Sequence, residues 1–405
     1  MASAVELPAG LELPTFKGRA GWEFTDISGL NLAAYQPVRG AEEVGGVGAE
    51  EVGGVGDASD RLPADRMFDA PAGELPDGVI VTSIERAARE HGELLRRHLG
   101  SLIGEGDDVF VSLNDAGYRA GSFVYVPRGM ELEVPISLAT VQATAGTLLN
   151  QRTLVVIEEG ARAEVWEQYL SGEAGLDGVF NAVTELIVGG GAHLRYVCGQ
   201  GLSERSWIFG AQRAEVGRDA GLDWVALGFG SARGRVRMET RLGGEGAEAR
   251  VTGAYASHGR QHIDFDTTQE HAAPNTTSDL AFRGVLTGRS SAVWRGNIIV
   301  DPGAQKTDAF QESRNLLLSK RAHADAIPGL EIQANDVRCT HAAAVAQLDP
   351  EQLFYLRSRG LKLDVARRLV IEGFLAALVE RFEEGPVRER LADSLERRLG
   401  LVLAE

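Results

Sequence analysis

A turn of small residues recurs along the middle of the chain, and each copy precedes a short run rich in strand-forming residues. The four copies are Gly160-Ala161, Gly191-Ala192, Ala220-Gly221 and Gly246-Ala247. Their alanines are separated by 31, 28 and 27 residues, counted from 161 to 192, 192 to 220 and 220 to 247. A near-constant repeat built from strands is typical of a solenoid, in which each coil buries its apolar face on the next.

The stretch from about 122 to 345 contains short strand-like runs separated by Gly, Asn and Asp, and no long apolar period of 3.6 residues. A β-sandwich also has many short strands. However, roughly 220 residues without a helix is long for one sandwich, whereas stacked coils can be added without limit. We therefore expect a mainly β fold with a parallel β-helix core at 119–347.

The N-terminal region, residues 1–118, is expected to be mixed and partly helical. Ser83 is a candidate N-cap for a helix that runs to Leu99, and Gly100 is placed to end it. Residues 41–56 consist of AEEVGGVG repeated twice, a composition that predicts a flexible, Gly-rich insert.

After the core, residues 348–405 predict a C-terminal helical domain. Asp349 can cap its first helix with Pro350 at the first helical position, and a third helix is expected to end at Leu399. The second helix carries its apolar residues mostly on one side: Val365, Leu369, Phe374, Leu378 and Phe382. Such short amphipathic helices must pack on the β core, or else on another protein.

Bulk composition excludes several classes of protein. The net charge of −17 argues against binding nucleic acid through its phosphates. No apolar run reaches 18 residues, so a membrane-spanning helix is not expected. Residues 1–10 lack the basic and apolar pattern of a secretory signal, and the two cysteines fit a reducing compartment. We therefore expect a cytoplasmic protein.

Common catalytic motifs are also missing from the sequence. There is no G-x-x-x-x-G-K-[ST] phosphate loop, no G-x-S-x-G nucleophile elbow and no H-E-x-x-H zinc motif. The chain is therefore expected to bind no nucleotide and to have no enzymatic activity.

Two groups of residues could bind a metal. The first group contains imidazole and carboxylate side chains close in sequence: His258, His262, Asp264, Asp266 and His271. His262 and Asp264 are two residues apart and would share one face of a strand. Such pairs often satisfy each other's hydrogen bonds, and we favour a structural or interface role for this group.

The second group is Cys339 and His341, which would also share a strand face. Thiolate and imidazole both suit iron, although a buried cysteine and a hydrogen-bonded histidine would give the same pattern. The other cysteine, Cys198, is expected to lie in the core. Two thiols cannot supply the four ligands that an iron–sulfur cluster usually takes, so further ligands would have to come from elsewhere.

Several runs resemble the SufB/SufD family of iron–sulfur cluster assembly proteins. They are WEFTD at 22–26, VPRG at 126–129, SRNLLLS at 313–319, NDVRCTH at 335–341 and LFYLRSRG at 353–360. The chain is more similar to SufD than to SufB. SufB-like chains carry a cysteine shortly after Ser-Arg-Asn, which residues 316–320 lack, whereas the Cys-x-His strand is typical of SufD-like chains.

The resemblance implies a right-handed parallel β-helix between N-terminal and C-terminal helical segments. It also implies a non-enzymatic scaffold that pairs with a SufB-like subunit and binds a SufC-like ABC-type ATPase. His341, with Cys339, would face a transient iron–sulfur cluster at the subunit interface. The residues expected to bind the ATPase are Leu353, Phe354, Tyr355, Arg357, Arg359 and Phe374.

One position departs from the family pattern, because Ala342 stands where a glycine usually follows the histidine. Two other functions remain open from sequence: a β-helix enzyme acting on polysaccharides, and a self-associating structural protein without metal chemistry. The sequence also leaves open whether the isolated chain forms a homodimer.

Overall fold

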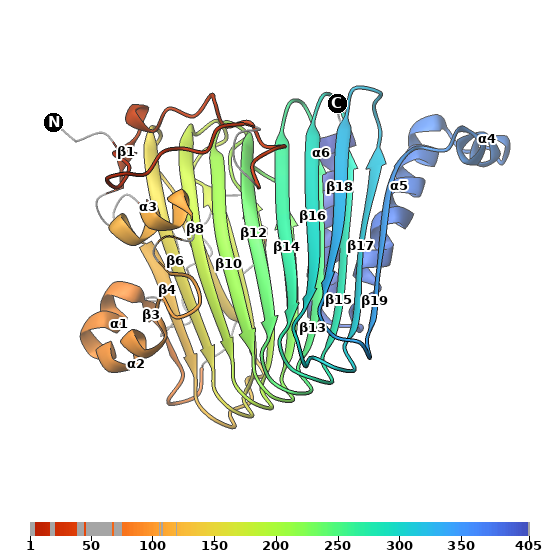
Figure 1. Ribbon diagram of the computed structural model, residues 1–405. Helices are drawn as coiled ribbons and strands as arrows, with labels where there is room; N and C mark the ends of the chain where they lie inside the picture. The colour runs from red at the N-terminus through yellow and green to blue at the C-terminus, as the bar shows by residue number, and fades with distance from the viewer. Residues whose placement is uncertain are drawn as a thin grey trace.

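Two long sheets face each other in the computed structural model, and from β4 onward the chain passes from one to the other at each successive strand (Figure 1). The structure describes residues 5–16, 21–38, 44–45, 67–68, 75–104, 106, 108–118 and 120–403. Within this part the strands pair in parallel from β4 onward and form a solenoid of about eight turns. The expected mainly β, parallel β-helix core is therefore confirmed.

The first sheet, called sheet A, contains the even-numbered strands from β4 to β18 together with β3 and β1. Its order is β18-β16-β14-β12-β10-β8-β6-β4-β3, with β1 beside β6. Their bounds are β1 Gln36–Pro37, β3 Ile80–Ser83, β4 Ala120–Val126, β6 Thr147–Ile157, β8 Gly178–Val188, β10 Trp207–Val216, β12 Arg233–Leu242, β14 His262–His271, β16 Ser291–Val300 and β18 His323–Ile332.

The second sheet, sheet B, has the order β19-β17-β15-β13-β11-β9-β7-β5-β2. Its strands are β2 Val44–Gly45, β5 Ile136–Gln142, β7 Arg162–Ser171, β9 His193–Gly201, β11 Gly221–Gly228, β13 Glu248–Ser257, β15 Thr277–Leu286, β17 Asp308–Leu317 and β19 Arg338–Gln347. The two-residue strand β2 belongs to the Gly-rich repeat, and the other residues of that repeat lie outside the described part of the chain.

The recurring small-residue turn leads into β7, β9, β11 and β13. Its left-handed position is filled by Gly160, Gly191 and Gly246, with φ of +70°, +64° and +73°. In the third copy Asp219 adopts φ +53°, which a short polar side chain tolerates better than most. The alanine of every copy is at most 2% exposed, because it points into the core. The repeat therefore reflects one backbone requirement and one packing requirement per coil.

Three N-terminal helices, α1 Ile84–Glu90, α2 Gly92–His98 and α3 Val109–Gly117, stand beside the first coils (Figure 1). Ser83 caps α1 by accepting a hydrogen bond from the backbone N–H of Arg86. The single helix expected from Ser83 to Leu99 is instead broken at His91, which has φ −131°.

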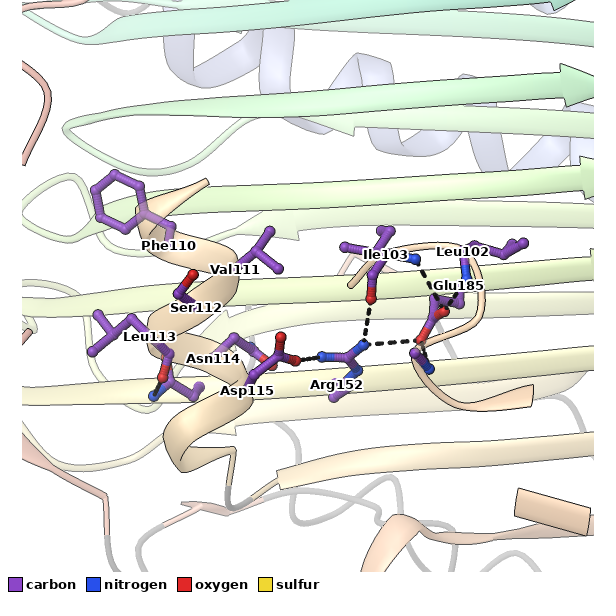
Figure 2. Close-up of polar contacts among 12 residues, drawn as sticks. Leu102, Ile103, Phe110, Val111, Ser112, Leu113, Asn114, Asp115, Arg152 and Glu185 are labelled. Atoms are coloured by element: carbon purple, nitrogen blue, oxygen red, sulfur yellow. Dashed lines mark hydrogen bonds and ion pairs between the residues drawn. The ribbon is translucent and has the colours of Figure 1, made fainter. Parts of the chain in front are cut away.

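A buried ion pair attaches this region to sheet A. Figure 2 shows Arg152 of β6 between Asp115 of α3 and Glu185 of β8. The side chains of Arg152 and Glu185 are 2% and 0% exposed. Glu185 also accepts hydrogen bonds from the N–H groups of Leu102 and Ile103. Breaking such a buried pair from one side costs about 3–5 kcal/mol, so the helices are held to the solenoid.

Three C-terminal helices follow the last strand: α4 Pro350–Ser358, α5 Leu363–Val379 and α6 Pro386–Leu403. Asp349 caps α4, as expected, by accepting a hydrogen bond from the N–H of Glu351. Helix α6 does not end at Leu399 but continues to Leu403. Apolar residues of α5 and α6 share one buried cluster with the outward side chains of sheet B, including Trp166, Val225 and Leu316. These two helices therefore pack on the β core.

None of the helices in the described ranges is long and apolar enough to cross a membrane.

Candidate functional site

The last coil of the solenoid carries Cys339 and His341. Both lie on β19, where Cys339 pairs with Ala309 and His341 pairs with Gln311 of the neighbouring strand β17. Within the described part of the chain β19 has no second neighbour in its sheet, so this end of the solenoid is open (Figure 1). An open sheet end presents unpaired backbone groups and is a ready surface for another chain.

The two side chains lie on the face of β19 that continues the interior of the solenoid. Gln311, the partner of His341, is 0% exposed, and its side-chain amide donates to the carbonyl oxygens of Gly296 and Gly329. His341 itself is exposed, because no described strand follows to cover it. The sequence-predicted pair is therefore brought together at an uncovered end of the core.

Cys339 and His341 differ in their surroundings. Cys339 is partly buried among small apolar residues, including Ala309 and Val337. Burial raises the pKa of its thiol, and the nearby carboxylate of Asp308 acts in the same direction. The thiol is therefore protonated near neutral pH in the free chain, and an approaching metal would have to displace its proton. The imidazole of His341 is directly accessible.

These two residues do not form a metal site by themselves. Among the described residues, no group of three or more His, Cys, Asp or Glu side chains is arranged to hold a metal ion. A cluster at this position would take its remaining ligands from another molecule.

The other predicted group is dispersed by the fold. His262 and Asp264 lie on the outer face of β14 and hold the N-terminal segment, through Thr25. The hydroxyl of Thr25 is 3.0 Å from Nε2 of His262 and donates to the carboxylate of Asp264. His258 instead lies in a turn beside Glu204.

The electrostatics of this group agree with its structural use. Burial lowers the pKa of His262 to about 4, and the guanidinium of Arg233 adds to the effect. Burial raises the pKa of Asp264 to about 6, against the opposing influence of Arg235. Neither side chain is open to solvent, because they are 7% and 4% exposed. His262 and Asp264 therefore join the N-terminal segment to the solenoid and offer no open ligand position.

Five of the six residues predicted to bind a partner lie together on or directly after α4, which has no buried residue. Phe354 and Tyr355 are 73% and 55% exposed. The sixth, Phe374, lies apart from them on α5, where the guanidinium of Arg283 stacks on its ring at 5.0 Å and donates to its carbonyl oxygen. Phe374 therefore faces sheet B.

The first half of α5 adds exposed apolar surface, although the sequence predicted that the apolar side of this helix would pack on the β core or on another protein. Leu378 and Phe382 are buried, as expected, at 1% and 3% exposure. Val365 and Leu369 are instead 47% and 49% exposed. The reason is placement, because the beginning of α5 extends toward α4 beyond the last coil (Figure 1). Leu363, 44% exposed, belongs to the same surface, and only the fold could identify it.

Comparison with known proteins places this architecture in a family. Residues 140–374 match the model of the SUF system FeS cluster assembly SufBD core domain, and residues 65–138 match the SufBD protein N-terminal region. The iron–sulfur cluster assembly protein SufD of Bacillus subtilis is 34% identical over 80% of this chain and 75% of its own length. SufBD family proteins of Mycobacterium leprae and Mycobacterium tuberculosis are 30% and 31% identical, over 70% of this chain and 73% and 72% of their own lengths.

A β-solenoid with these two matched regions is an iron–sulfur cluster assembly protein. The chain belongs to the SufBD family and is SufD-like, as its sequence motifs indicated.

Proposed function

We propose that the chain is a non-enzymatic scaffold subunit that pairs with a SufB-like subunit through the open end of its solenoid. The nascent iron–sulfur cluster is the cargo of that interface, and His341 faces it. The observation that carries the proposal is the incomplete pair of ligands, Cys339 and His341, on an uncovered terminal strand. A second subunit would both cover the strand and supply the missing ligands.

We further propose that a SufC-like ATPase docks on α4 and the beginning of α5. An exposed helix with two aromatic residues and neighbouring arginines has the composition of an interface centre. ATP would then be hydrolysed by the partner, and this chain would bind no nucleotide. The absence of a phosphate loop from the sequence supports this division of labour. Neither cysteine forms a disulfide, which agrees with a protein that functions in the reducing cytoplasm.

Anaerobic co-expression with the SufB-like and SufC-like proteins of the same organism tests the proposal. We expect one complex that contains all three chains and carries iron and sulfide, measured by size-exclusion chromatography and by chemical analysis. The chain alone should hold neither iron nor sulfide and should hydrolyse no ATP. The proposal fails if the isolated chain hydrolyses ATP, or if the three chains do not associate.

A further inference from the structure

A cavity of about 630 Å³ is lined by residues that do not belong to β19, the strand at the open end of the solenoid. One wall is the last part of α6, with Ser394, Arg397 and Leu401. The opposite wall consists of the loops after β7, β9 and β11, at 171–175, 201–205 and 229–230. Its volume lies within the roughly 300–1,000 Å³ range of small-molecule sites.

The floor of the cavity is apolar and fixed. Met67, Leu202 and Phe229 line it and are 6%, 2% and 5% exposed. The carbonyl oxygen of Met67 accepts hydrogen bonds from the side chains of Ser394 and Arg397, which join this residue to α6. Because these side chains are already packed, a ligand entering the cavity would lose little affinity to their ordering.

Arg398, one of the three arginines in the described lining, forms an ion pair. Nη1 of Arg398 lies 3.4 Å from the carboxylate of Glu204, and the side chain is 8% exposed. Its other nitrogens donate to the carbonyl oxygen of Ala256 and to the side chain of Gln261. Arg398 is therefore a fixed part of the wall.

The positive charge of the other two arginines in the lining is not neutralised by a close carboxylate among the described residues. Arg397 donates to neutral oxygens, and no carboxylate in the described chain lies within ion-pair distance of it. Arg205 is 68% exposed and lies 3.7 Å from Asp177, a distance at which an exposed pair contributes little. Among the described residues of the lining, Glu173 and Glu204 are the acidic ones, and together with the three arginines they give a formal charge of +1.

From this geometry we propose that the cavity is a binding site for a small amphipathic organic anion. Its apolar body would rest on Phe229 and Leu202, and its acidic group would pair with Arg397. Such a site is separate from the cluster interface and from the proposed ATPase surface, and its occupancy would join α6 more firmly to the solenoid. The proposal does not depend on the assembly function.

A matched pair of fluorescent probes tests the site on the isolated full-length chain. 1-Anilinonaphthalene-8-sulfonate carries a sulfonate, and N-phenyl-1-naphthylamine has the same rings without it. We expect Arg397→Gln to weaken binding of the anionic probe about fivefold and to leave the neutral probe unchanged, because one charge-assisted hydrogen bond is lost. Arg388→Gln, on the same helix but outside the lining, should change neither affinity.

The alternative is unspecific binding of the anionic probe to exposed apolar surface such as α4. In that case Arg397→Gln would leave its affinity unchanged, or Arg388→Gln would lower it equally, and either result overturns the proposal. Equal weakening of both probes by Arg397→Gln would also overturn it, because it would reflect damage to the cavity instead of a lost charge.

Discussion

His341 and Cys339 lie on the same strand face, but the histidine is exposed whereas the cysteine is partly buried. Replacing an exposed ring should cost little folding free energy, within about 0.5 kcal/mol. We therefore expect His341→Ala to leave the melting temperature of the chain and its assembly with both partners unchanged. The purified complex should nevertheless lose most of its iron and sulfide, because a ligand at the shared interface is gone.

Cys339→Ala is the matched comparison for this experiment. Its thiol is partly buried and protonated in the free chain, so we expect a smaller loss of cluster content than with His341→Ala. A His341→Ala complex with wild-type iron and sulfide would contradict the assignment. A variant that melts far below the wild type would instead give His341 a structural role.

His271 should make stability depend on pH. It is fully buried, with its ring nitrogens 2.8 Å from the hydroxyls of Thr276 and Ser278, and burial lowers its pKa to about 4. In the unfolded chain this imidazole binds a proton near pH 6.5, so the neutral ring contributes its full stability to the fold above that pH. That contribution is lost as the pH falls toward 4, and we expect the free energy of unfolding to decrease by about 2 kcal/mol between pH 7 and pH 5.

Thermal melting at the two pH values measures this effect. His271→Gln cannot titrate there, so its melting temperature should fall less than that of the wild type between pH 7 and 5. His323→Gln, at a side chain that is 69% exposed, should behave like the wild type. If His271→Gln were as sensitive to acid as the wild type, other groups would carry the pH dependence.

Among the elements, α4 stands out because it contributes nothing to the core. All its residues are at least partly exposed, and its two aromatic side chains, Phe354 and Tyr355, are 73% and 55% exposed. Replacing both Phe354 and Tyr355 by alanine should lower the affinity for the ATPase at least tenfold, since exposed aromatic residues dominate most interfaces. Isothermal titration with the purified ATPase measures this affinity.

Leu401→Ala provides the control for the α4 experiment. Leu401 is 61% exposed, on α6, away from the proposed surface. Both variants should melt like the wild type, because neither empties a buried position. Unchanged ATPase affinity in the Phe354/Tyr355 double variant would place the docking site elsewhere.

At the scale of the whole molecule, α5 and α6 belong to the body of the solenoid. Three arginines attach this segment to sheet B: Arg250 and Arg283 donate to carbonyl oxygens of Arg381 and Phe374, and Arg381 pairs with Asp279. Ending the chain at Leu348 would uncover the outer apolar face of sheet B. We expect that truncation to aggregate, as judged by light scattering after purification.

A Gly/Ser linker in place of residues 350–358 is the matched control, since it removes α4 and keeps α5 and α6. This chain should remain monodisperse and should melt near the wild-type temperature. If the truncated chain were equally soluble and stable, α5 and α6 would form an independent unit.

Much of this architecture follows from local conformational preferences that can be recognised in the sequence. The spacing of the small-residue turns predicted the coils, because each turn needs a left-handed residue and a buried alanine. Asp349 predicted the start of α4, because its side chain satisfies a free N–H group of the first turn. Cys339 and His341 were predicted to share a face, because side chains alternate along a strand.

The tertiary structure decided what each of these residues meets. Periodicity gave Val365 and Phe382 the same side of one helix, but only the position of the last coil left Val365 exposed and buried Phe382. In the same way, His262 and His341 are both strand histidines, and the sequence does not distinguish their exposure. The first is covered by the N-terminal segment, through Thr25, which is 237 residues away along the chain. The second lies on the last strand of the solenoid, where no described strand covers it. Exposure depends on contacts between distant parts of the chain, and local patterns do not encode those contacts.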